Sequence, residues 1–178
     1  MFEPSLTQVD LRTHVERFVA AEISPYATAW DRDEGAHPYP MHLFTKLGEL
    51  GWLGIGFDES VGGSGGGPVE RCVLFEELAR GSAGAALGIY VHTALAAAAL
   101  AQVGGPELAQ RFVPTMLAGR LTGAWAYAEP GSGADVTRVS LTARHEGDHF
   151  VLNGSKTYIT NGTFADLILV VARTSGEP

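Results

Sequence analysis

The amino-acid sequence begins with an apolar stripe of helical period. Between residues 11 and 23, apolar residues recur at intervals of three or four: Leu11, Val15, Phe18, Val19 and Ile23. This spacing predicts an amphipathic helix with one buried face. Thr7 is suited to cap its start, with Asp10 placed to complete a capping-box-like arrangement. Pro25 is expected to end it, because proline cannot continue a helix.

A second helix is predicted after Pro38 and Pro40, and it is expected to end at Gly51. Its inward face is expected to comprise Leu43, Phe44, Leu47 and Leu50. The glycine-rich stretch over residues 58–68 that follows lacks the glycine register and the Lys-Ser or Lys-Thr pair of a nucleotide-binding loop. We therefore expect a flexible connector there.

Two central helices are predicted over residues 69–80 and 82–103. The second has no charged residue from 83 to 103 and is long enough to tempt a membrane assignment. Its many Ala and Gly residues and the polar side chains within it predict weak insertion, so we expect a buried core helix and no membrane span. Cys72 lies in the apolar pattern of the first helix and is expected to be a core thiol.

A last helix is predicted to open at Pro106, with Leu108 and Phe112 on one face. Pro114 is expected to break or kink it, because a proline inside a helix removes a backbone donor. This helix would complete an all-α domain over residues 1–120.

Beyond residue 120 the pattern changes to that of strands. An apolar run covers residues 121–128, and Val139, Leu141 and Ala143 alternate with polar residues. Alternation of this kind is the signal of a half-buried strand. The chain is then expected to turn over residues 145–148.

Asn153-Gly154 is a dipeptide typical of two-residue hairpins, and it is expected to join strands over 150–152 and 156–160. A final buried strand is predicted over 166–173. About five strands with uncovered edges make a poor independent sheet. The sequence therefore predicts an α+β, multidomain chain, in which an N-terminal all-α helical bundle is followed by an incomplete antiparallel β-barrel-like domain over residues 121–178.

Composition and charge narrow the range of functions. The chain has 178 residues and a formal net charge of −8, which argues against nucleic acid and anionic membrane surfaces as partners. Its single cysteine excludes a disulfide framework within the chain and a cysteine-based zinc site. His145 and His149 are four residues apart but lie across an expected turn, so no metal site is expected. The N-terminus lacks the basic region of a signal peptide and is acidic, which favours a cytoplasmic location.

A candidate ligand site lies where the helical pattern gives way to strands. The apolar run leads into Glu129-Pro130 and the small-residue loop Gly131–Ala134. A flat or anionic ligand can approach the main-chain N–H groups of such a loop closely. The segment Tyr158–Gly162, about 25 residues later, is expected to form the opposite wall of the same site.

Two motifs at these positions give the chain a resemblance to the acyl-CoA dehydrogenase family. They are Glu129-Pro130-x-x-Gly133-x-Asp135 and Asn153-Gly154-x-Lys156-x-x-Ile159-Thr160-Asn161, and stretches near residues 47–63, 76–80 and 91–93 also resemble the family's helices. The likeness implies an N-terminal helical domain, a middle β-domain and a C-terminal four-helix domain that also makes the tetramer. The first and about half of the second are expected in this chain, and the third is expected to be absent.

The resemblance further implies FAD as cofactor. The strand over residues 125–128 would offer backbone groups to the flavin, and Gly133 and Ala134 would lie near its pyrophosphate. Tyr158 would lay its ring against the flavin, and the Thr160 hydroxyl would form a hydrogen bond near N5. The full implied cofactor set is Trp125, Tyr127, Ala128, Gly133, Ala134, Tyr158, Ile159 and Thr160.

Two alanines depart from the family's usual pattern. Ala128 stands where Thr or Ser is common and Ala134 where Ser is common, and each loses one side-chain hydrogen bond, worth about 1 kcal/mol. For the acyl-CoA substrate, the resemblance points to His92 and Thr93 on the apolar helix and to Ala134. A core histidine satisfied by its neighbours is the alternative for His92.

The family reaction is α,β-dehydrogenation of an acyl-CoA thioester, with hydride transfer to flavin N5 and electrons passing to an electron-transfer flavoprotein. The family's base is a glutamate in the C-terminal part, so no catalytic residue is assigned here, and Glu129 is expected to be structural. The chain alone is expected to be inactive and to hold FAD weakly or not at all; a homo-oligomer is expected once the C-terminal domain is supplied. The alternatives are an acyl-CoA oxidase or flavin monooxygenase on the same scaffold, and a non-enzymatic helical interaction module.

Overall fold

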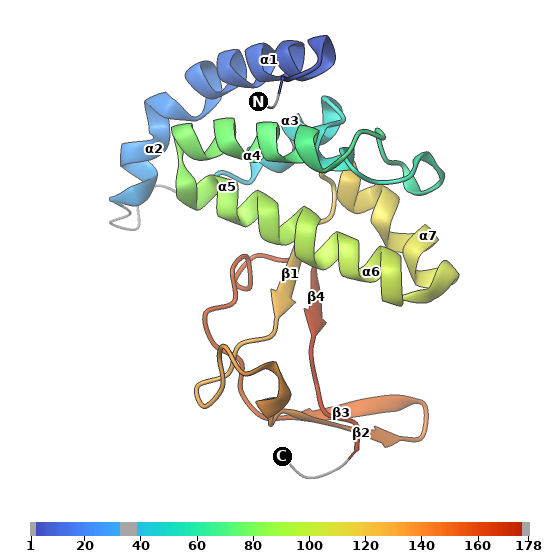
Figure 1. Ribbon diagram of the computed structural model, residues 1–178. Helices are drawn as coiled ribbons and strands as arrows, with labels where there is room; N and C mark the ends of the chain where they lie inside the picture. Colours follow the sequence, from blue (N-terminus) through green and yellow to red (C-terminus); the bar gives the residue numbers. More distant parts are fainter. Residues whose placement is uncertain (1–2, 33–38, 176–178) are drawn as a thin grey trace.

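The computed structural model describes residues 3–32 and 39–175. The helices gather in one body, and the strands project from its lower side (Figure 1). The N-terminal helix lies outermost at one end of the molecule, and a two-stranded hairpin lies at the other. The expected class, a helical domain followed by a small and incomplete β region, is confirmed.

The first helix, α1 (Leu6–Glu22), is amphipathic as predicted but begins earlier than expected. The Ser5 hydroxyl oxygen accepts the backbone N–H of Gln8 at 3.2 Å, and Gln8 Oε1 accepts the backbone N–H of Ser5 at 3.0 Å. This reciprocal capping box replaces the one expected between Thr7 and Asp10, because it satisfies donors at the true start of the helix. The buried part of the stripe is Val15, Val19 and Ile23.

Pro25 lies just after the end of the first helix and within the first turn of another one. α1 ends at Glu22, and α2 (Ser24–Asp31) follows at once with Pro25 in its first turn. A proline is tolerated there because the first N–H groups of a helix have no intrahelical acceptor. The helix α2 was therefore not predicted from the sequence.

The next helix, α3 (His42–Glu49), buries three of its four predicted inward residues. They are Leu43, Phe44 and Leu47. Leu50 is 50% exposed because it lies just past the end of the helix, where Gly51 takes a left-handed φ of 74°. Pro38, expected to precede this helix, lies outside the described residues.

The two predicted central helices are present, and the second contains an unexpected π-helical segment. α4 (Pro68–Gly81) is followed by α5 (Ala83–Tyr90), the π-helix η3 (Val91–Ala97) and α6 (Ala98–Val103). The continuous stretch from Ala83 to Val103 is long and apolar enough to cross a membrane, but 56% of its most apolar window is buried inside the fold. It runs along the lower side of the helical body, next to the strands (Figure 1).

The last helix, α7 (Gly105–Leu117), continues past Pro114 for most of a turn. Its buried face also differs from the expected one, since Leu108 is 41% exposed. The residues that do face the core are Ala109, Val113, Met116 and Leu117. The helix therefore does not break at Pro114, which was one of the two expected outcomes, but ends at Leu117.

The glycine-rich stretch folds back on the residues that precede it. It contains the short 3₁₀ turn η2 (Glu59–Val61) and follows η1 (Trp52–Gly54). The Ser64 hydroxyl donates to the Gly51 carbonyl at 2.6 Å, and the Gly56 N–H donates to the Gly65 carbonyl at 2.7 Å. The expected connector is thus a hydrogen-bonded turn structure.

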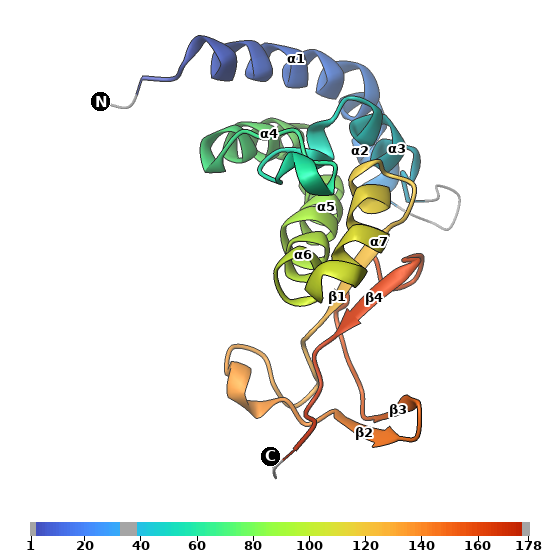
Figure 2. The same cartoon turned by 90° about the vertical axis from the view of Figure 1, so that its right-hand side faces the viewer.

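The β region consists, within the described residues, of two separate two-stranded sheets. β1 (Gly123–Ala126) pairs with β4 (Leu167–Val170), and the pairing is parallel although antiparallel strands were expected. Figure 2 shows both strands running down side by side from the helices. A parallel pair needs a long crossover, and here the crossover carries the remaining β elements.

The second sheet is a hairpin of β2 (Thr142–Glu146) and β3 (His149–Asn153). Its turn lies at Gly147, which has a left-handed φ of 65°, and not at Asn153-Gly154. The strand expected over residues 156–160 is absent from the described chain, and Val139 and Leu141 are buried in the segment before β2. Asn153-Gly154 instead leads the chain away from the hairpin.

The single cysteine and the two histidines of the hairpin are all exposed. Cys72 is an exposed free thiol, so the expected core position is wrong. His145 and His149 lie exposed on the hairpin, and the described residues contain no group of three or more metal-ligating side chains.

The close approach of α3 to the end of α7 gives a test of the helical packing. A Cβ on Gly48 would collide with the backbone carbonyl of Ala118, whereas at Gly84 the nearest atom would be 3.9 Å away. We expect Gly48→Ala to lower the free energy of unfolding by about 1–3 kcal/mol, because backbone cannot move aside as a side chain can. Urea denaturation measures this change.

Gly84→Ala is the matched control, since it places the same methyl group in a helix with room for it. It should leave stability unchanged or raise it by up to about 1 kcal/mol through helix propensity. Equal effects of the two substitutions would contradict the packing described.

Candidate functional site

A buried ion pair joins the two sequence motifs. Lys156 Nζ donates to Glu129 Oε1 at 2.8 Å and to the backbone carbonyl of Tyr127 at 2.8 Å. The side chains of Lys156 and Glu129 are only 8% and 2% exposed. Charges buried to this degree require a partner of opposite charge, and each motif supplies the counter-charge for the other.

Glu129 also fixes the segment that leads into the hairpin. Its carboxylate accepts the Ser140 N–H at 2.8 Å, the Ser140 hydroxyl at 2.6 Å and the Leu141 N–H at 2.9 Å. The hydrogen bond from Lys156, followed by those from Ser140 and Leu141, lowers the pKa of Glu129 to about 2. The Glu129 carboxylate is thereby committed to contacts within the chain.

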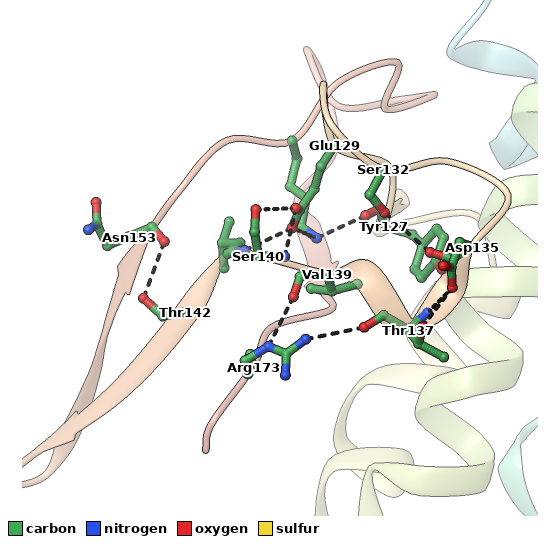
Figure 3. Close-up of polar contacts among 12 residues, drawn as sticks. Tyr127, Glu129, Ser132, Asp135, Thr137, Val139, Ser140, Thr142, Asn153 and Arg173 are labelled. Atoms are coloured by element: carbon green, nitrogen blue, oxygen red, sulfur yellow. Dashed lines mark hydrogen bonds and ion pairs between the residues drawn. The ribbon is translucent and has the colours of Figure 1, made fainter. Parts of the chain in front are cut away.

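The same segment is held from its other side. Arg173 Nε donates to the Val139 carbonyl at 3.1 Å, and its terminal nitrogen donates to the Thr137 carbonyl at 3.2 Å. Figure 3 shows this guanidinium and the Glu129 carboxylate approaching the segment that contains Val139 and Ser140. The segment that follows the first motif is therefore held by two side chains, Glu129 and Arg173, from different parts of the chain.

The ion pair lies beside a cleft that gathers most of the predicted cofactor residues. A further bond, from the Thr157 N–H to the Ala128 carbonyl at 2.9 Å, brings the second motif alongside the end of β1. The cleft has a volume of about 210 Å³. It is lined by Trp125, Tyr127, Ala128, Tyr158, Ile159 and Thr160, together with Val91 and Leu95.

The second motif has an unusual backbone at the cleft. Tyr158 and Asn161 take left-handed φ values of 55° and 67°. Asparagine adopts this conformation readily, but a tyrosine there is strained. The result is a Tyr158 ring that is 93% exposed at the cleft edge.

His92 and Thr93, predicted to bind substrate, are enclosed by protein. His92 is fully buried; its Nδ1 accepts the Gly123 N–H at 2.9 Å and its Nε2 lies 3.0 Å from the Met116 carbonyl. These partners assign the proton to Nε2, and burial lowers the pKa of His92 to about 4. The Thr93 hydroxyl donates to the Ile89 carbonyl at 2.9 Å. Neither side chain lines the cleft, and the core-histidine alternative describes the geometry better.

Val91 and Leu95, on the same π-helical segment, are the cleft residues that the sequence did not reveal. They lie four positions apart and form one wall of the cleft. Apart from His92 and Thr93 the segment is apolar, and its pattern does not mark which face is turned toward the β region. The nearest residue that the sequence did predict was His92, one position after the cleft residue Val91.

Gly133 and Ala134 lie in an exposed loop outside the cleft. The loop closes on itself through the pair of backbone bonds between Glu129 and Ser132, both at 3.1 Å. A Cβ on Gly133 would have no neighbour within 4 Å, so the main chain there is accessible from solvent. The structure thus separates these two residues from the other six predicted to contact the cofactor.

A larger hollow of about 560 Å³ lies between α4, the glycine-rich loop and the central helix. Tyr90 and Ala94 line it, each one residue before a cleft residue. Phe75 and Pro68 add apolar surface, and Arg71 adds a cation. The volume lies in the range of small-molecule sites.

Comparison with known proteins identifies the family. Residues 5–120 match the model of the acyl-CoA dehydrogenase N-terminal domain, and residues 124–178 match that of the acyl-CoA dehydrogenase middle domain. The chain therefore belongs to the acyl-CoA dehydrogenase family.

Individual relatives match over nearly the whole chain. The mitochondrial long-chain specific acyl-CoA dehydrogenase of Rattus norvegicus is 37% identical over 166 residues, 93% of this chain and 38% of that protein. A solved probable acyl-CoA dehydrogenase from Mycobacterium abscessus superimposes with a TM-score of 0.88 at 36% identity, covering 97% of this chain and 46% of that one. A solved glutaryl-CoA dehydrogenase from Mycobacterium smegmatis in complex with FADH2 superimposes with a TM-score of 0.89 at 28% identity. This match covers 97% of this chain and 44% of that one. The chain thus spans less than half the length of each.

The Glu129–Lys156 pair can be tested by neutralising one partner. Glu129→Gln keeps the shape but leaves the Lys156 ammonium buried without its counter-charge, so we expect a clear loss of stability in urea denaturation at pH 7. The pKa of Glu129 is lowered on folding, so its contribution is complete above its ordinary value of 4.5 and declines as the pH falls toward about 2. The gap between the wild type and this variant should therefore narrow at pH 3.

Glu146→Gln is the control, since Glu146 pairs with Arg144 on the surface, with side chains 42% and 75% exposed. Exposed pairs contribute little, so this substitution should change stability by less than about 1 kcal/mol. If the two substitutions had equal effects, or if the gap at Glu129 did not change with pH, the role assigned to the buried pair would be wrong.

Proposed function

We propose that this chain is the N-terminal portion of an FAD-dependent acyl-CoA dehydrogenase, which converts an acyl-CoA thioester to its α,β-unsaturated form. The observation that carries the proposal is the cleft, because six of the eight residues predicted to contact the cofactor meet there. Membership of the family and the FADH2 complex of one relative add support.

The residues at the cleft suit a flat aromatic cofactor with polar edges. Trp125 and Tyr158 supply rings, and Thr160 supplies a hydroxyl. The Tyr127 hydroxyl is buried without a hydrogen-bond partner among the described residues, which leaves a polar atom for a ligand to satisfy. FAD, when bound, supplies the hydride acceptor. The protein would orient it through these side chains and would favour charge developing at its edge through the Thr160 hydroxyl.

The acyl group of the substrate is proposed to occupy the larger hollow beside the cleft. Its lining is apolar at Phe75 and Ala94, as an acyl chain requires, and Arg71 offers a cation to the phosphate groups of the coenzyme A portion. Hollow and cleft are lined by adjacent residues of one helix, which would bring substrate and cofactor together.

The catalytic base is proposed to come from outside residues 1–178. None of the described residues that line the cleft is acidic, and the Glu129 carboxylate is engaged in four contacts, three hydrogen bonds from Ser140 and Leu141 and the ion pair with Lys156. An electron-transfer flavoprotein would accept the electrons. Oligomerisation would depend on the C-terminal four-helix domain of the family.

Turnover by the purified chain tests where the base lies. Supplied with FAD, acyl-CoAs of several lengths and a ferrocenium acceptor, the 178-residue chain should show no acceptor reduction above the protein-free rate. Measurable turnover would mean that residues 1–178 contain a base, and this part of the proposal would fall. Rapid reaction of bound, reduced flavin with oxygen would favour the oxidase or monooxygenase alternative.

Flavin binding tests the cleft itself. We expect weak quenching of FAD fluorescence by the chain and about fivefold tighter binding by Ala128→Thr, because a hydroxyl at the cleft adds one hydrogen bond of about 1 kcal/mol. Ala128→Val has the same shape without the hydroxyl and is the control.

Equal affinities of the Thr and Val variants would contradict a hydrogen bond to flavin at position 128. A complete lack of quenching by the wild type and both variants would favour the helical interaction module over a flavoprotein.

A further inference from the structure

Gly123 is the first residue of β1, and both its backbone N–H and its backbone carbonyl form hydrogen bonds with side chains from distant parts of the chain. Its N–H donates to His92 Nδ1 at 2.9 Å, and its carbonyl accepts from Asn161 Nδ2 at 3.1 Å. All three residues are buried. We call this arrangement the Gly123 bridge.

The bridge requires glycine at its centre. A Cβ on Gly123 would lie 2.5 Å from the terminal methyl of Met116 and 2.9 Å from the Cβ of Ala96. Strand β1 therefore starts in direct contact with the π-helix and α7, closer than any side chain allows.

His92 connects the bridge to two helices. Its ring lies on the π-helical segment, and its second nitrogen bonds to the Met116 carbonyl on α7 at 3.0 Å. The same segment presents Val91 and Leu95 to the cleft. The position of β1 relative to this wall is thus set through an imidazole with no free nitrogen. Single π-helical turns are frequent at functional sites, and this one holds the residue that makes the contact.

Asn161 connects the bridge to the opposite wall. It follows Thr160 directly, and its amide also donates to the Gly88 carbonyl at 2.9 Å. Its left-handed backbone ends the segment that carries Tyr158–Thr160. The segment is therefore held to both β1 and α5 by one amide group.

The remaining atom of that amide, Asn161 Oδ1, is buried without a hydrogen-bond partner among the described residues. The Tyr39 hydroxyl oxygen is likewise buried and unpaired among them, and both oxygens lie close to Gly88.

We propose that His92 and Asn161 are positioning residues that fix the spacing of the three walls of the flavin cleft through Gly123. The walls are the end of β1 with Trp125–Ala128, the segment Tyr158–Thr160, and Val91 with Leu95. The proposal rests on the proposed function only in that the cleft takes flavin; the bridge itself is a property of the chain without ligand.

Nuclear magnetic resonance of the wild-type chain tests the bridge directly. The expected result is a scalar coupling between the Gly123 amide nitrogen and His92 Nδ1 across their hydrogen bond, with the His92 proton on Nε2. A His92 protonated on Nδ1, or a Gly123 amide that exchanges with solvent as fast as an unstructured one, would overturn the proposal without any substitution.

Two substitutions of one residue separate the contacts of the imidazole. His92→Asn can place an oxygen near the position of Nδ1 and keep the bond from Gly123, whereas His92→Gln reaches toward Met116 and loses it. We expect hydrogen exchange at residues 123–128 and 158–161 to stay within about twofold of wild type in the first and to rise about tenfold in the second, the factor for one lost hydrogen bond. Leu78→Ala, in the core away from the cleft, should raise exchange without singling out these residues.

Asn161→Asp tests the other side, because it removes the donors with little change of shape. It should raise exchange in the same two segments, and its effect combined with His92→Gln should be less than the product of the two, because both act through Gly123. Independent effects, or changes confined to the substituted segment, would overturn the proposal.

Flavin titration then separates this proposal from the proposed function. If the wild type binds FAD, His92→Gln and Asn161→Asp should weaken binding about tenfold and His92→Asn should not. If the wild type binds no FAD, the chain alone does not form the proposed flavin site, while the coupling and exchange results still decide whether the bridge holds the cleft.

Discussion

The β region depends on one buried ion pair. Lys156 and Glu129 come from separate motifs and meet with side chains almost removed from water. Within this region neither charge could remain buried without the other, because an unpaired charge in a protein interior is strongly destabilising. Their meeting fixes the end of β1, the segment leading into the hairpin and the loop that carries Tyr158. A small region, in which the described residues form two short sheets, is thereby given a single arrangement.

The helices contribute to the site through close contact more than through polar chemistry. Two apolar clusters fill the helical body, one around Phe44 and Leu78 and one around Val113 and Met116. The second cluster also receives Leu167 and Leu169 of β4. The parallel strands are therefore an extension of the helical core, and the cleft forms where that core opens toward the hairpin.

The sequence predicted features that depend on local pattern and failed on those that depend on distant partners. The stripe of α1 and the apolar central helix follow from spacing alone, and two short motifs were enough to predict most of the cleft. The ion pair of Glu129 with Lys156 was not predicted, because it joins residues 27 positions apart that no local pattern connects. His92 was predicted to bind substrate, with a core position as the alternative, because the spacing of a mostly apolar helix does not show which face packs against the β region.

The strand errors have a related cause. Residues 156–160 have a composition compatible with a strand, but Lys156 is committed to Glu129 and Tyr158 takes a left-handed backbone. Pairing of β1 with β4 is parallel because both strands start from the helical core, a condition set by residues more than 40 positions apart. Local propensity carries no information on either point.

The π-helical segment has a consequence for how this scaffold tolerates insertions and deletions. A π turn accommodates one residue more than an α turn while the helix ends stay where they are. Removing a single residue from Val91–Ala97 would therefore let the helix close as a regular α-helix while α5 and α6 keep their orientation relative to one another. The change would be confined to the segment itself, where Val91, His92 and Leu95 would no longer all keep their present directions. The extra residue of the π-helix thus allows one short segment to contact both Gly123 and the cleft.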